Sequence, residues 1–135
     1  MRKLDIIIIS MIGSLSLSTI ENCQYVLRMF ETEATPFILF IEVLMRDLFS
    51  VTLHISTGTI IGAGIASAVD NKKNIICQLP KILLVPIILH GLYDGILLWV
   101  SINVKSTGNM WLSGIYFLAI FIVIISVSLA IIKVI

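Results

Sequence analysis

The sequence predicts an all-α protein, a polytopic bundle of about four transmembrane helices with one short interfacial helix. Apolar residues make up 59% of the 135 residues, well above the roughly 45–50% of soluble domains. The mean hydropathy of +1.11 also indicates a membrane protein. The apolar runs approach the about 20 residues that cross a hydrocarbon layer. A large soluble core is excluded, because too few polar residues exist to cover it. A net charge of +1, with no basic cluster beyond Lys72-Lys73, gives no indication of nucleic-acid binding.

The spans follow from uninterrupted apolar runs. They cover residues 4–27, 48–69, 82–102 and 110–132, and with the interfacial helix they form a single transmembrane domain, 1–135. Residues 37–46 are assigned to the interfacial helix because Glu42 interrupts their apolar run. Residues 70–74 are typical of a turn, and Gly108-Asn109 marks the last loop. The first run is too long for a signal peptide and is expected to be retained.

The distribution of basic residues orients the bundle. Lysine and arginine alternate between the two sides, with Arg2, Lys3, Lys72, Lys73, Lys81 and Lys133 on one side and Arg28, Arg46 and Lys105 on the other. The positive-inside rule places the first group, and with it both termini, in the cytoplasm.

Four ionisable residues lie within the predicted spans: Glu21, His54, His90 and Asp94. At 1.5 Å per residue, Glu21, His54 and Asp94 lie about 10 Å below the outer surface, with His90 one turn deeper. His90 and Asp94 are spaced i, i+4 and therefore share a helix face. Ionisable groups at membrane depth are costly and mark functional sites. We therefore expect one polar cluster in the outer half of the membrane, although helix–helix contacts alone would also explain each residue.

Small and polar residues accompany this cluster. Gly58 and Gly62 follow His54 at i+4 steps, and Gly91 and Gly95 flank His90 and Asp94, so these glycines are interpreted as helix-packing positions. The supporting residues predicted around the cluster are Asn22, Arg46, Ser50 and Tyr93. Arg46 is interpreted either as a partner for a carboxylate or as an interfacial arginine whose head reaches water.

Common catalytic motifs are absent, including a glycine-rich phosphate loop, HExxH and GxSxG. A set of Glu21, His54, His90 and Asp94 has the donor atoms to bind zinc. The same residues are also suited to activating water without a metal, through a Glu–His general base. The sequence leaves both alternatives open: no cofactor, or a divalent metal such as zinc.

Three segments resemble the PrsW family of intramembrane proteases, relatives of the CAAX prenyl-protease membrane superfamily. They are DIIIISMIGSLSLSTIENCQYVL at 5–27, RDLFSVTLHISTGTIIGAG at 46–64 and LHGLYDGIL at 89–97. The order and spacing of these segments carry the resemblance over the first 100 residues. Two departures stand out: Leu17 replaces the usual phenylalanine, and the chain begins downstream of the family's Glu-Glu-x-x-Lys motif. The resemblance thus suggests an N-terminally incomplete or degenerate member.

The resemblance implies an integral protein of a bacterial cytoplasmic membrane that cleaves a membrane-anchored protein near the extracytoplasmic face. Glu21 and His54 would position or activate water, and His90 and Asp94 would polarise it or stabilise the oxyanion. Partner helices or self-association would complete a bundle that lacks the acidic motif. The alternative is a non-catalytic membrane scaffold or subunit that keeps the fold and its polar cluster, and a third reading is an ion or proton conduit, which the resemblance disfavours.

Overall fold

The computed structural model describes residues 2–31 and 36–107, together with residues 114, 118, 121, 122 and 125. The described chain forms three long helices, α1 (Lys3–Glu31), α2 (Pro36–Asp70) and α3 (Ile75–Thr107), and contains no strand. The predicted all-α class is therefore confirmed. Three segments are long and apolar enough to cross a membrane: Lys3–Glu31, Asp47–Asp70 and Ile75–Trp99.

One predicted element differs from the structure, and another lies largely outside the described residues. Residues 37–46 are helical, but they continue without a break into α2 instead of forming a separate interfacial helix. Pro36 suits the first position of a helix. Residues 37–57 contain neither proline nor glycine, so no helix-breaking residue separates 37–46 from the rest of α2. The predicted fourth span, 110–132, falls largely outside the described residues.

The turn between α2 and α3 is fixed by backbone hydrogen bonds. Lys73 N–H donates to the Ala68 carbonyl at 2.9 Å and Lys72 N–H to the Val69 carbonyl at 3.1 Å, the two bonds of a Schellman motif. Lys72 adopts the left-handed conformation that this motif requires, with φ of 52°. The Asn74 side chain then accepts the Ile76 N–H at 3.0 Å and caps the start of α3.

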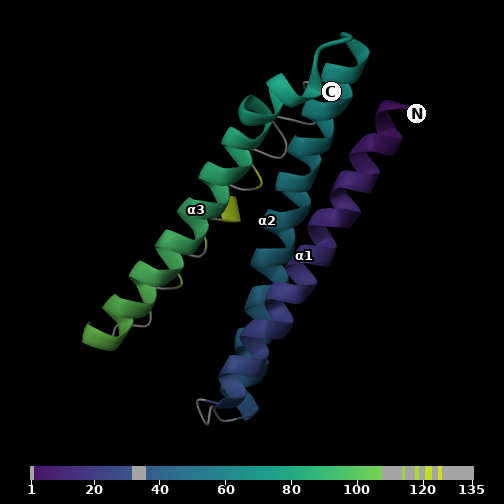
Figure 1. Cartoon of the computed structure of the whole chain (residues 1–135). Helices are drawn as coiled ribbons and strands as arrows, with labels where there is room; N and C mark the ends of the chain where they lie inside the picture. Colours follow the sequence, from purple (N-terminus) through teal and green to yellow (C-terminus); the bar gives the residue numbers. More distant parts are fainter. Residues whose placement is uncertain are drawn as a thin grey trace.

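In the described bundle, α2 lies in the middle and packs against both neighbours, as Figure 1 shows. Glycines allow α1 to approach α2 very closely. A Cβ built at Gly62 would lie 2.7 Å from the Ile7 Cα, and one at Gly58 would lie 2.9 Å from the Ser10 carbonyl oxygen. No Cα of α1 lies within 8 Å of a Cα of α3 among the described residues. The position of α1 relative to α3 therefore depends on its contact with α2.

A small hydrophobic cluster joins α2 to α3. Phe49, Leu53 and Tyr93 form its buried part. Phe121 packs against this cluster, with its ring centroid 5.3 Å from that of Phe49 in an edge-to-face arrangement. Phe49 and His54 are five residues apart, which at 100° per residue is about 140° around α2. Phe121 therefore contacts a different side of α2 from the one that carries His54.

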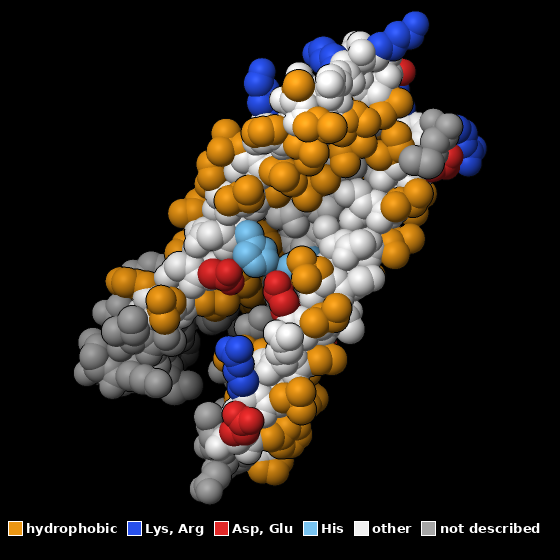
Figure 2. All heavy atoms as spheres, in the orientation of Figure 1, with side chains coloured by type: hydrophobic (Ala, Val, Ile, Leu, Met, Phe, Trp, Pro, Cys, Tyr) orange, Lys and Arg blue, Asp and Glu red, His pale blue; other side chains and the backbone are white. Residues whose placement is uncertain are grey.

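Charged residues tie one end of the bundle together. The Lys3 ammonium lies 2.9 Å from the Asp70 carboxylate, which joins the start of α1 to the end of α2. Arg2 pairs with Asp5 at 3.3 Å. Most Lys and Arg side chains in Figure 2 gather at this end, which is the end that the positive-inside rule assigns to the cytoplasm.

Ser18 offers a test of the α1–α2 interface. Its side chain is fully buried, and its hydroxyl has no hydrogen-bond partner among the described residues. A buried hydroxyl without a partner costs about 1–3 kcal/mol. We expect Ser18→Ala to raise the free energy of unfolding by about 1 kcal/mol, measured by detergent titration of the purified protein. Ser16→Ala is the control, because Ser16 is exposed and bonds the carbonyl of Ile12 in its own helix. A destabilised Ser18→Ala protein would contradict this reading of the interface.

Candidate functional site

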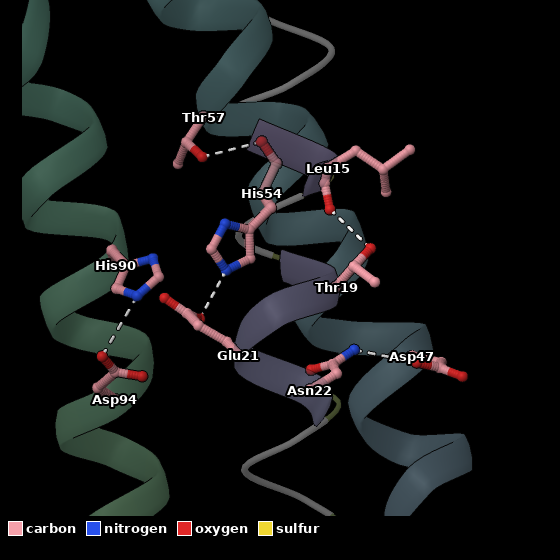
Figure 3. A network of polar contacts seen from close by, with 9 residues as sticks. All are labelled: Leu15, Thr19, Glu21, Asn22, Asp47, His54, Thr57, His90 and Asp94. Carbon is pink, nitrogen blue, oxygen red and sulfur yellow. Dashed lines mark hydrogen bonds and ion pairs between the residues drawn. The ribbon is translucent and has the colours of Figure 1, made fainter. Parts of the chain in front are cut away.

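Glu21 and His54 form the centre of the site. Glu21 Oε2 of α1 lies 3.0 Å from His54 Nε2 of α2 (Figure 3). The imidazole of His54 is 3% exposed, whereas the Glu21 side chain is 34% exposed. The close approach at Gly58 and Gly62 brings the two helices near enough for this contact. A carboxylate accessible from outside therefore meets a buried imidazole.

His90 of α3 adds a second imidazole. The ring centroids of His54 and His90 lie 5.0 Å apart, with the rings inclined by 76°. One donor atom from each of Glu21, His54 and His90 lies within 4.8 Å of the other two. Three residues from three different helices therefore converge, although no described Cα of α1 lies within 8 Å of a Cα of α3.

Asp94 lies behind His90 on the same face of α3. Its Oδ2 is 3.4 Å from His90 Nε2, and its side chain is 62% exposed. Figure 3 shows this carboxylate beside His90 while Glu21 reaches towards the two imidazoles from the opposite side. Asp94 is therefore placed to orient His90 and stands outside the group of three converging donors.

The predicted supporting residues occupy different places. Asn22 Nδ2 donates to Asp47 Oδ1 at 3.0 Å, which forms a second polar contact between α1 and α2. Ser50 is buried. Tyr93 is buried in the hydrophobic cluster with Phe49 and Leu53. The side chain of Arg46 lies outside the described residues, so its role stays a prediction.

Asp47 was missed by the sequence reasoning, although its spacing carries a signal. It precedes His54 by seven residues, or two helical turns, which places both residues on nearly the same face of α2.

The predicted packing glycines have different surroundings in α2 and α3. Gly58 and Gly62 contact α1, whereas no described atom lies within 4 Å of a Cβ built at Gly91 or Gly95, whose packing role stays a prediction.

A family model described as PrsW family intramembrane metalloprotease matches residues 1–128, nearly the whole chain. The chain belongs to the PrsW family. Searches of curated proteins and of solved structures give no match. The PrsW match agrees with the resemblance carried by the segments around Glu21, His54 and His90.

A PrsW metalloprotease requires a metal, and the converging donors fit one. Imidazole nitrogen and carboxylate oxygen are common zinc ligands, at about 2.0–2.2 Å from the ion. Ligand atoms around a tetrahedral ion at that distance lie about 3.3–3.6 Å apart. Glu21, His54 and His90 each place one such atom within 4.8 Å of the other two, which is near that spacing.

Proposed function

We propose that this PrsW family chain is an intramembrane endopeptidase that cleaves a membrane-anchored protein near the extracytoplasmic face. The observation that carries the proposal is the convergence of Glu21, His54 and His90 from three helices. Each is an ionisable group within an apolar segment, where such groups are costly unless they have a partner or a function. The family's description as metalloproteases supports the peptidase reaction.

Glu21, His54 and His90 would hold the metal, and Asp94 would orient one of these ligands. A zinc-class ion bound there would supply Lewis-acid activation of water and of the scissile carbonyl. His54, which is buried, fixes the depth of the site, while Glu21 closes it from the side of α1. The Asp94 carboxylate, 3.4 Å from His90 Nε2, would hold the His90 ring, because a carboxylate beside a ligating imidazole fixes the ring orientation and raises its basicity.

The position of the site along α1 supports cleavage near one face. Glu21 is 18 residues from Lys3 and 10 residues from Glu31, so it lies about 27 Å from the basic end of α1 and about 15 Å from the other end. The basic end carries the Lys3–Asp70 ion pair. With that end in the cytoplasm, the site lies in the outer half of the membrane.

This orientation can be tested with the native cysteines. Both Cys23 and Cys77 are exposed, and Cys77 lies in the first turn of α3, beside the basic turn. In a Cys23→Ser background, we expect a membrane-impermeant maleimide to label Cys77 in inverted vesicles and to leave it unlabelled in intact cells. Labelling in intact cells would instead place the basic end outside and would contradict cleavage at the extracytoplasmic face.

The peptidase reaction is tested with purified protein in vesicles that contain single-span reporter proteins tagged at both ends. We expect the wild-type protein to cleave a reporter and Glu21→Gln to reduce cleavage to background. Asp5→Asn is the matched control, since it makes the same change near the basic end of the same helix. Equal background cleavage by wild-type and Glu21→Gln protein, over reporters of varied sequence, would contradict the peptidase and favour the non-catalytic scaffold.

A further inference from the structure

Asn22 and Asp47 form a polar contact directly beside the Glu21–His54 pair. The Asn22 amide donates to the Asp47 carboxylate at 3.0 Å, as Figure 3 shows. Asn22 follows Glu21 in α1, and Asp47 precedes His54 by two turns in α2. Two adjacent residues of α1 are therefore bonded to two points about 10 Å apart along one face of α2.

This pair of contacts determines where the Glu21 carboxylate points. Because no described Cα of α1 lies within 8 Å of a Cα of α3, the distance from Glu21 to His90 depends on how α1 packs on α2. The glycine contacts at Gly58 and Gly62 allow a close approach, but contacts between small residues have little directionality. Hydrogen bonds are directional, and two of them spaced along a helix oppose both rotation and sliding. Glu21–His54 is the first of these hydrogen bonds between α1 and α2, and Asn22–Asp47 is the second.

We propose that Asp47 is a positioning residue for the metal-binding group. By accepting the Asn22 amide, Asp47 holds α1 in the rotation that directs Glu21 towards the two imidazoles, while Asp47 itself stays outside the converging donors. The inference rests on the proposed function for its catalytic meaning.

The first test uses metal-free protein and detects the position of the Glu21 carboxylate through the NMR signals of the His54 imidazole. The protein contains two histidines, so ring-labelled histidine gives two sets of imidazole NMR signals. We expect Asp47→Leu to move the His54 signals towards their positions in Glu21→Gln. Glu21→Gln eliminates the Glu21 carboxylate, and Asp47→Leu lets it move away from the His54 imidazole. Asp47→Asn keeps an oxygen that can accept the Asn22 amide, so its His54 signals are expected to stay close to the wild-type positions.

The second test measures zinc affinity of the full chain in micelles by competition with a chromophoric chelator. Asp47→Leu is expected to weaken zinc binding by about threefold to twentyfold, the range that corresponds to hydrogen bonds between membrane helices. Asn22→Leu is expected to show the same loss, and the double variant no further loss. The matched control is Asp70→Leu, which removes the Lys3 contact from the same helix pair at the opposite end and is expected to bind zinc like the wild type.

Several results would overturn the positioning role. These are unchanged His54 signals in Asp47→Leu, an Asp47→Asn protein as impaired as Asp47→Leu, additive losses in the double variant, or an equal loss in Asp70→Leu. Failure of the proposed function gives a different result. In that case the wild-type protein neither cleaves nor binds zinc, yet Asp47→Leu still moves the His54 signals.

Discussion

Replacing His54 with alanine is expected to abolish stoichiometric zinc binding and to lower the cleavage rate by at least about a hundredfold. His54 is the most buried member of the converging group, and its Nε2 lies 3.0 Å from the Glu21 carboxylate. Removing the ring leaves Glu21 and His90 on α1 and α3, whose described Cα atoms all lie more than 8 Å apart. The measurements are zinc titration of the purified protein and cleavage of the reporter in vesicles.

The control for this variant is Thr59→Val in the same helix. The Thr59 hydroxyl bonds only the Ile55 carbonyl of its own helix among the described residues, at 2.8 Å, so its loss removes a polar group without reaching the site. Asp94→Asn is expected to give a smaller effect than His54→Ala, about 10–100-fold in zinc affinity, since Asp94 acts through His90. If the His54→Ala variant bound zinc as tightly as the wild-type protein, the zinc site would have to lie elsewhere.

Replacing Gly62 with valine is expected to give the largest loss of stability. The Cβ alone would lie 2.7 Å from the Ile7 Cα and 3.3 Å from the Ile6 carbonyl oxygen, so the new side chain must push one backbone away from the other. Overpacking of this kind costs about 1–3 kcal/mol and more where the backbone cannot move. We expect the free energy of unfolding, measured by detergent titration, to fall by at least about 3 kcal/mol.

The matched control is Gly13→Ala in α1. No described atom lies within 4 Å of a Cβ built at Gly13, so alanine there adds helix propensity without a clash and is expected to stabilise by up to about 1 kcal/mol. Gly62→Val should also lower cleavage in the fraction that stays folded, because separating α1 from α2 separates Glu21 from His54. Similar stabilities for the two variants would contradict the close packing of α1 on α2.

The sequence predicted the helical class and the main spans because long apolar runs have few alternatives to a helix in a membrane. It made the predicted spans shorter than the helices, since α2 begins at Pro36 and α3 extends to Thr107, and polar helix ends carry no hydropathy signal. The separate interfacial helix was predicted from Glu42, but one acidic residue does not break a helix. Helix continuity depends on backbone geometry, which hydropathy does not report.

The candidate site could be predicted in part for a similar reason. Glu21, His54 and His90 stood out because each is ionisable within an apolar run, and the structure brings their donor atoms together. Asp47 did not stand out, because it follows Arg46 at the polar start of a span, and its partner Asn22 lies on another helix. A contact across helices depends on their rotation, and hydropathy alone does not determine rotation.

X-ray absorption spectroscopy of the zinc-loaded wild-type protein tests the central claim most directly. If Glu21, His54 and His90 form one centre, the spectrum should show a single class of zinc with two imidazole ligands and the remaining ligands oxygen. A zinc shell that contains sulfur from Cys23 or Cys77, or one with fewer than two imidazoles, would contradict a centre built from these three helices.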